Sequence, residues 1–305
     1  MPDITFSLPE NALTYINTVK DRCHDLIQFK IWEGIKSIDL KRWLNNFNND
    51  IELYFAACIL DALIYRSSDQ TLSMATELFT KKLPSHLNKI GFNFKDYKDL
   101  VTLLRSPVTN ELRLVSVATK NERPVKSSNV ILRDYKRRLS FNDNWFIHPD
   151  EVKIEANSNG VKTFIFIDDF LGTGNQFDTM YKGYGFQMTL KECNTIYCPL
   201  VAHKSGMEYL MNKHHNLTIV STELLDGTFD IFNYAFDDGT NNPDCARKFY
   251  DKLLKDNKFP NSLEENKYGF GNLGLAYTFS HSSPDNCLNI IWDNNNGGWH
   301  PLIAK

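Results

Sequence analysis

The apolar residues between Pro9 and Leu104 recur at the three- and four-residue spacing of amphipathic helices. Two of these series are Ile51, Phe55, Ile59, Leu63 and Leu72, Ala75, Leu78, Phe79. This spacing predicts an all-helical N-terminal region. Trp43 and Phe47 lie four residues apart in another helical segment, where they are interpreted as core residues, with a partner-binding ridge as the alternative.

After Pro107 the pattern changes to short runs of β-forming residues separated by polar helical segments. The runs are Leu112–Ala118, Thr163–Ile167, Thr195–Val201, Leu217–Ser221 and Leu275–Phe279. This alternation is typical of a parallel sheet with crossover helices, so the predicted fold class is α/β. The change near Ser106-Pro107 predicts a helical region with an interaction or regulatory role over residues 1–106 and an α/β domain over residues 107–305.

Composition and charge narrow the possible functions. Of the 305 residues 42% are apolar and 23% are charged, as in ordinary globular domains, and the formal net charge of −3 gives no global attraction to nucleic acid or anionic lipid. The sequence has no secretory-signal pattern and no apolar run of membrane-spanning length, so we expect a cytoplasmic protein with no membrane contact. The six scattered cysteines are interpreted as reduced, buried thiols rather than a zinc site.

The strongest chemical signal is the segment Thr163–Phe177, TFIFIDDFLGTGNQF. Four apolar residues predict a strand buried on both faces, and Asp168 and Asp169 follow it at the end where ligands bind in such folds. Adjacent buried carboxylates repel each other unless they accept hydrogen bonds from hydroxyl groups or face a cation. The Gly172–Gly174 turn and a predicted helix over Gln176–Met188 favour a phosphate. A ribose 5-phosphate meets both requirements.

Other interpretations of the acidic pair are weaker. No GxxxxGK[ST] loop accompanies it, so a Walker B role lacks its partner, and a third glycine of a dinucleotide fingerprint is missing because Phe177 stands there. A haloacid-dehalogenase-type phosphatase needs its two acids separated by one residue, whereas these are adjacent. A purely structural acidic turn and some other nucleotide or phosphate site stay open.

The segment resembles the phosphoribosyl pyrophosphate (PRPP) motif of type I phosphoribosyltransferases: a hydrophobic strand, two acids, three residues, then Thr-Gly. The resemblance implies that Asp168 and Asp169 bind the ribose hydroxyls and that Gly172, Thr173, Gly174, Asn175 and Gln176 bind the 5′-phosphate. Gln176 departs from the threonine that metabolic enzymes commonly have, which argues against ordinary salvage activity. The resemblance also implies Mg²⁺ chelated by the substrate and reached by Asp168 or Asp169 directly or through water.

Phosphoribosyltransferases have a second loop, which receives the pyrophosphate and follows an earlier strand of the sheet. The stretch Arg123–Asn129 occupies the matching place, with Lys126, Ser127 and Ser128 as candidate ligands just before a predicted helix. The stretch His203–Gly206, after another predicted strand, is interpreted as an exposed polar turn, with contact to an acceptor as the alternative.

Wider features resemble phosphoribosyltransferase-like effectors of bacterial antiphage loci, some of them retron-associated. They are DDFLGTGNQ, the stretch Tyr268–Asn286, the tail Gly298–Leu302 and the helical N-terminal half. This resemblance implies an effector that binds PRPP or a related nucleotide and transfers or cleaves at ribose C1. The alternatives are a non-catalytic nucleotide sensor and a structural partner in a complex with a reverse transcriptase or another accessory protein. Homo-oligomer formation, direct nucleic-acid binding and the acceptor are left open.

Overall fold

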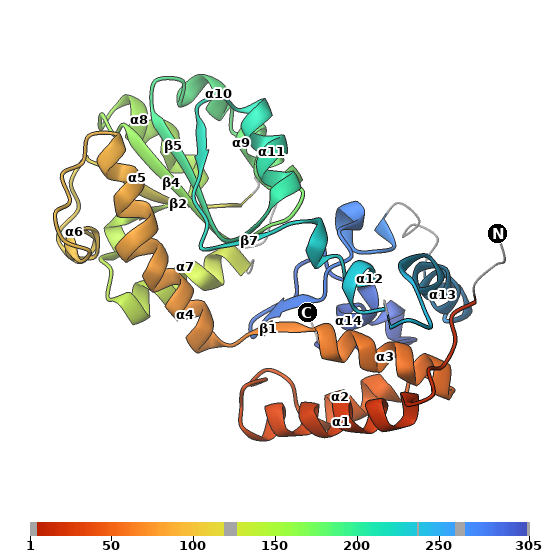
Figure 1. Cartoon of the computed structure of the whole chain (residues 1–305). Helices are drawn as coiled ribbons and strands as arrows, with labels where there is room; N and C mark the ends of the chain where they lie inside the picture. The colour runs from red at the N-terminus through yellow and green to blue at the C-terminus, as the bar shows by residue number, and fades with distance from the viewer. Residues whose placement is uncertain (1–4, 119–126, 237, 260–265, 304–305) are drawn as a thin grey trace. The chain divides into compact units, whose positions relative to one another are not determined.

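The computed structural model describes residues 5–118, 127–236, 238–259 and 266–303, and it describes no side chains for residues 127–131 and 134. The chain divides into two compact units, one formed by residues 1–68 with 226–305 and the other by residues 69–225. Both are visible in Figure 1. Within the described residues, no helix combines the length and the apolar character needed to cross a membrane.

The unit of residues 69–225 is built on a parallel sheet of six strands in the order β3-β2-β4-β5-β6, with β7 pairing on β5. Its strands are β2 Arg113–Ser116, β3 Phe146–Ile147, β4 Thr163–Leu171, β5 Asn194–His203, β6 Leu217–Ile219 and β7 Glu223–Leu225. Its helices are α4 Ser68–Glu77, η1 Leu78–Lys82, α5 Leu83–Lys89, α6 Asp99–Arg105, α7 Ser127–Leu139, η2 Asp143–Trp145, η3 Pro149–Glu151, α8 Val152–Asn157, α9 Asn175–Gly183, α10 Phe186–Thr189 and α11 Lys204–Lys213. The α/β fold class predicted from the sequence is confirmed, and four of the five predicted strands lie in this sheet.

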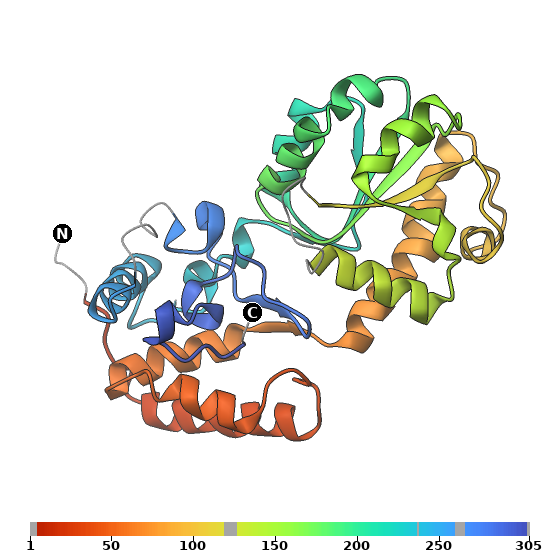
Figure 2. The same cartoon turned by 180° about the vertical axis from the view of Figure 1, so that it is seen from behind.

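Helices cover both faces of this sheet. On one face, Phe164 and Phe166 of β4 share a buried cluster with Phe177 of α9, Phe186 of α10 and Leu210 of α11. Helices α4, α5 and α7 lie over the opposite face (Figures 1 and 2). Burial on both faces is the reason that β4 needs the uninterrupted run Phe164–Ile167.

The unit that joins the two ends of the chain is mostly helical. Its elements are α1 Ala12–Gln28, α2 Ser37–Leu44, α3 Asp50–Ala62, β1 Ile64–Arg66, η4 Gly227–Phe229, α12 Ile231–Tyr234, α13 Pro243–Asp256, η6 Phe270–Asn272, β8 Tyr277–Phe279, α14 Asn289–Trp292 and η7 Asn295–Gly297. Aromatic side chains from both ends of the chain form its core, for example Phe55 and Phe236, whose rings stack with centroids 4.7 Å apart.

The expectation of an all-helical N-terminal region was wrong at β1. Strand β1 pairs in parallel with β8, Ile64 opposite Tyr277, so the last strand predicted from the sequence belongs to this two-stranded sheet and not to the six-stranded one. The strand β1 is three residues long and continues the apolar series of α3. Its strand conformation depends on a partner far away in the sequence, and local spacing does not reveal that partner.

The division into units also differs from the predicted break near Ser106. Residues 69–105 pack with the sheet: the Phe79 ring contacts the rings of Tyr135 and Phe141, and Thr222 donates a hydrogen bond to the backbone oxygen of Met74. Residues 226–305 pack instead with the first 68 residues. Helical spacing identified these helices but carried no information about which surface they cover.

Trp43 is a core residue, as the sequence indicated. Its side chain is fully buried and donates from Nε1 to the backbone oxygen of Ile290 at 2.7 Å, and Trp299 donates to the same oxygen at 2.9 Å. Two helical segments that are far apart in sequence, α2 and α14, are thereby joined.

We expect Trp43→Ala to lower the free energy of unfolding by about 3–5 kcal/mol, because it removes a large buried ring and leaves a cavity. Phe29→Ala is the matched control, since Phe29 is 71% exposed and its removal should change stability by less than about 0.5 kcal/mol. Denaturant unfolding monitored by circular dichroism measures both. Similar midpoints for Trp43→Ala and the wild type would contradict the core assignment.

Candidate functional site

Strand β4 carries Asp168 and Asp169 beyond the end of its pairing with β2. That pairing stops at Ile167, opposite Ser116, whereas the pairing with β5 continues through Asp168, opposite Pro199, to Leu171. The two acids therefore lie within the strand, not after it as the sequence suggested. They are at the carboxyl end of the sheet, where ligands bind in open α/β folds.

Both acids are almost completely buried, with exposed fractions of 3% for Asp168 and 6% for Asp169. Asp168 is on the same sheet face as Phe166, and its Oδ2 accepts a hydrogen bond from the Tyr197 hydroxyl at 2.9 Å. Asp169 is the next residue of the strand, and its carboxyl group is close enough to that of Asp168 to interact with it directly. Asp169 Oδ1 accepts from the backbone N–H of Phe170 at 2.9 Å.

The electrostatics of the pair favour a proton on Asp168. Burial raises the pKa of Asp168 well above the usual aspartate range, and the neighbouring Asp169 carboxylate raises it further. Burial and the charge of Asp168 also raise the pKa of Tyr197, so its hydroxyl stays protonated and donates to Asp168. Two adjacent carboxyl groups thus share a site that disfavours a double negative charge.

The turn after β4 leads directly into α9. Gly174 precedes the helix with φ of 85°, a left-handed conformation that favours glycine, and Asn175 is the first helical residue. Thr173 is half-buried, and its hydroxyl oxygen accepts from the Asn175 N–H at 3.4 Å, while Asn175 and Gln176 are exposed. Of the predicted phosphate-binding residues, Asn175 and Gln176 are the exposed ones, and Gly172 and Gly174 are buried.

The start of α11 packs against this turn. A Cβ atom on Gly206 would lie 2.0 Å from the backbone oxygen of Gly172, so only glycine lets the two segments approach this closely. His203 caps α11 by accepting from the Ser205 N–H at 3.3 Å and is itself buried. The stretch His203–Gly206 is therefore the beginning of a helix that packs on the loop and not a turn, and Lys204 and Ser205 are exposed, as the sequence suggested, whereas His203 and Gly206 are buried.

Asp178 also fixes α9 to α11, and the sequence analysis missed it. Its carboxylate accepts from Lys182 at 2.8 Å, Lys213 at 3.0 Å and Tyr209 at 3.1 Å, and it pairs with His214 at 2.9 Å. Burial opposes ionisation, but these hydrogen bonds lower the pKa of Asp178 to about 2. Its partners are up to 36 positions away in sequence, and the adjacent His214-His215 gave no spacing signal that pointed to Asp178.

The predicted pyrophosphate loop is only partly placed. Lys126 lies outside the described residues, and Ser127 and Ser128 form the first turn of α7, with side chains that are not described. Helix α7 packs against β4 and β2, so its first turn belongs to the same unit as the acids.

A Mg²⁺ ion that brings most of its own ligands fits the donor set of this site. In the described parts of the chain, no three His, Cys, Asp or Glu side chains come together as a metal site. Asp168 and Asp169 offer carboxylate oxygens, which Mg²⁺ prefers, and a nearby cation would relieve their mutual repulsion. The remaining ligands would be phosphate oxygens of a substrate and water.

Three features are those of a phosphoribosyltransferase-like protein: the parallel sheet, the acids at the end of its central strand and the glycine turn at the start of α9. A family model described as PRTase-CE matches residues 40–305, so the chain belongs to that family. No curated protein and no solved structure matches the chain.

We expect Asp168→Asn to stabilise the ligand-free chain increasingly as pH rises. A raised folded-state pKa means that unfolding releases a proton between the unfolded value near 3.9 and the higher folded value. The contribution of Asp168 to the free energy of unfolding is then fully present below the unfolded-state pKa. It falls by about 1.4 kcal/mol per pH unit until the pH reaches the folded-state pKa. The amide variant lacks this loss.

Thermal unfolding from pH 4 to pH 9 measures this difference. Glu208→Gln, a change at an exposed position of α11, is the control and should follow the wild-type pH profile. Parallel curves for Asp168→Asn and the wild type would show that burial does not perturb Asp168.

We expect Gly206→Ala to lower the free energy of unfolding by about 1–3 kcal/mol, because the added methyl group collides with the Gly172 carbonyl. Gly183→Ala is the matched control, since no atom lies within 4 Å of the position of its added methyl group. Denaturation midpoints compare the two variants, and equal midpoints would show that the loop does not depend on contact with α11.

Proposed function

We propose that this phosphoribosyltransferase-like chain binds PRPP, or a related ribose-phosphate nucleotide, with Mg²⁺ at the carboxyl end of β4 and transfers or cleaves at ribose C1. The observation that supports the proposal most is the order of groups along the chain. Two buried acids in β4 lead through Phe170 and Leu171 into a glycine turn that opens a helix.

The phosphate end of the ligand is assigned to the turn and the first residues of α9. The backbone N–H of Asp178 donates the first hydrogen bond of the helix, to the backbone oxygen of Gly174 at 3.0 Å. The N–H groups of Gln176 and Phe177 come before this bond and have no acceptor within the helix. Amide groups at a helix start favour a phosphate, and the exposed Asn175 and Gln176 side chains add amide donors. Thr173 adds a hydroxyl group.

The ribose end is assigned to Asp168 and Asp169. Hydroxyl groups of the sugar would donate hydrogen bonds to the acids, and Mg²⁺ would lower the cost of ionising both. Because both side chains are at least 94% buried, a ribose reaches them only if the neighbouring side chains move aside. Binding is therefore expected to be coupled to local opening at the end of β4.

The proposed reaction is a glycosyl transfer or cleavage at ribose C1. The bond from C1 to pyrophosphate would break, pyrophosphate would leave with the bonding electrons, and an acceptor or water would form the new bond to C1. Positive charge builds on the ribose ring in this exchange, and the chain's contribution would be to position the sugar and to stabilise that charge with the carboxyl groups. The sequence resemblance to antiphage effectors supports a cytoplasmic role in phage defence, in which the product or the consumed nucleotide affects the phage or the host cell. A reverse transcriptase or another accessory protein is the proposed partner.

A nucleotide sensor that transfers nothing is the second candidate, and the burial of the acids favours it. A closed site that opens for its ligand couples binding to a conformational change, and a regulator needs such coupling. A third candidate, a structural partner in a reverse-transcriptase complex, needs no ligand at this site.

Isothermal titration calorimetry with PRPP and Mg²⁺ tests the proposal. We expect the wild type to bind and Asp168→Asn/Asp169→Asn to bind at least about 100-fold more weakly, because two charge-assisted interactions of about 1.5–3 kcal/mol each are lost. Glu208→Gln should bind like the wild type. Thermal unfolding of the double variant checks that it remains folded.

The outcomes separate the candidates. An absence of binding by the wild type would contradict both the effector and the sensor proposals. Binding with pyrophosphate release favours the effector, and binding without any release or nucleotide conversion favours the sensor. Phage resistance that survives the double substitution favours the structural partner.

A further inference from the structure

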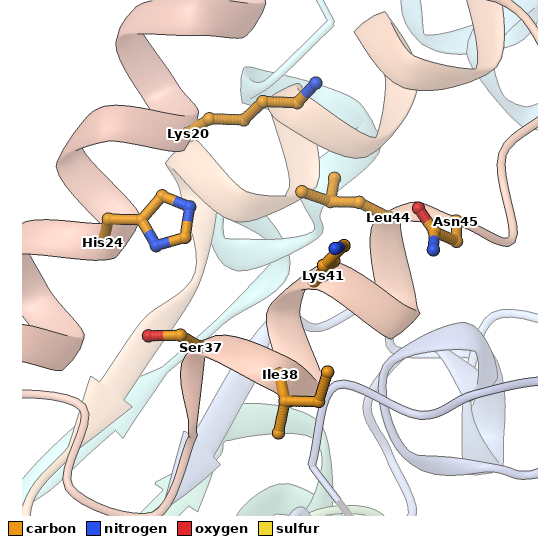
Figure 3. Close-up of a pocket in the computed structure, with 7 residues that line it drawn as sticks. All are labelled: Lys20, His24, Ser37, Ile38, Lys41, Leu44 and Asn45. Carbon is orange, nitrogen blue, oxygen red and sulfur yellow. The ribbon is translucent and has the colours of Figure 1, made fainter.

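The second feature that points to a ligand is a pocket of about 470 Å³ between α1 and α2, in the unit that joins the chain ends (Figure 3). Its volume is within the range of small-molecule sites. Lys20 and His24 line it from α1, and Ser37, Lys41 and Asn45 line it from α2 and the residue that follows. The pocket is independent of the acids in β4, because it belongs to the other unit.

The polar lining is basic or neutral. The pocket has no aspartate or glutamate among its lining residues, and Lys20, His24 and Lys41 form no ion pair within the described parts of the chain. Asp39, the acid nearest to them along α2, accepts from the Lys36 backbone N–H at 3.0 Å and does not line the pocket. Two lysines and a histidine therefore line the hollow with no acid among its lining residues, an arrangement that favours an anion there.

The helices hold these groups in fixed places. Lys20 and His24 are four residues apart on α1, so they share one face of the helix, while Val19 and Cys23 are buried. Figure 3 shows the His24 ring and the Leu44 side chain extending toward each other across the hollow. The hydrogen bond from Trp43 to the backbone oxygen of Ile290 fixes helix α2 on the core of its unit. A ligand that binds between these helices therefore needs little rearrangement of the backbone.

The lining also has an apolar part. Leu44 is half-buried and Ile38 is 46% exposed, so a ligand seated among the basic groups could cover apolar surface as well. Ser37 and Asn45 supply a hydroxyl group and an amide group that can donate hydrogen bonds. The combination suits a compact molecule with a phosphate group at one end and a flat or apolar group at the other.

We propose that this pocket is a second binding site, specific for a small phosphorylated ligand of mononucleotide size. Lys20, His24 and Lys41 bind the phosphate group, and Ile38 and Leu44 pack against the base. An extended polyanion such as nucleic acid is disfavoured, because the exposed Asp21 and Asp25 put negative charge on α1 outside the hollow. In a chain that already has one proposed nucleotide site, such a pocket would serve regulation.

Hydrogen–deuterium exchange of the full-length protein tests the proposal with adenosine 5′-monophosphate as the probe, because exchange reports which segment is protected. We expect protection of peptides that cover residues 20–45. Lys20→Gln/Lys41→Gln should weaken the apparent affinity at least about tenfold, since two charged contacts to phosphate are lost. Lys252→Gln/Lys255→Gln, at exposed positions of α13, is the matched control and should keep wild-type protection.

Inorganic phosphate at the same concentration is expected to protect residues 20–45 more weakly, because it cannot cover Ile38 and Leu44. The proposal is overturned if the nucleotide leaves residues 20–45 unprotected at millimolar concentration, or if protection persists in Lys20→Gln/Lys41→Gln. It is also overturned if single-stranded DNA protects this segment and the mononucleotide does not. Protection of residues 168–183 reports separately on the site in β4, so failure at one site is distinguishable from failure at the other.

Discussion

Two neighbouring carboxyl groups are held in the interior by the pairing of β4 with β5. The ladder continues past Ile167, where β2 stops, and it takes Asp168 and Asp169 into a region that water barely reaches. A strand that served only the core would have apolar residues here, because burial of adjacent acids costs free energy. The chain keeps them and supplies the Tyr197 hydroxyl as a hydrogen-bond donor, an arrangement typical of sites that sacrifice stability for function.

The loop that follows depends on contacts made by side chains outside the motif. Gly206 lets α11 approach the Gly172 carbonyl, and Asp178 of α9 is joined to α11 through Tyr209, Lys213 and His214. The phosphate-binding geometry proposed for the turn is therefore a property of two helices and a strand together. The motif supplies the groups proposed to bind the ligand, and the surrounding helices fix where those groups lie.

Local spacing was sufficient to predict much of this arrangement. The run Phe164–Ile167 indicated a buried strand, and the glycines after it indicated a turn into a helix, because both signals are contained within a few residues. The roles of Tyr197, Asp178 and Gly206 were not predictable, since each depends on a contact between segments about 30 or more positions apart. The division of the chain was missed for the same reason: an apolar helix face has no preference for one core over another until tertiary contacts form.

The sheet unit is continuous in sequence, whereas the other unit combines the first 68 residues with the last 80 or so. During synthesis, the six strands can assemble before the C-terminal segment leaves the ribosome. Trp43 cannot form its hydrogen bond until Ile290, which lies 247 positions later, has been synthesised. Until then the apolar faces of α1 to α3 lack the side chains that cover them. A ribosome that stalled after β7 would leave a nascent chain with one finished unit and one exposed, aggregation-prone helical surface.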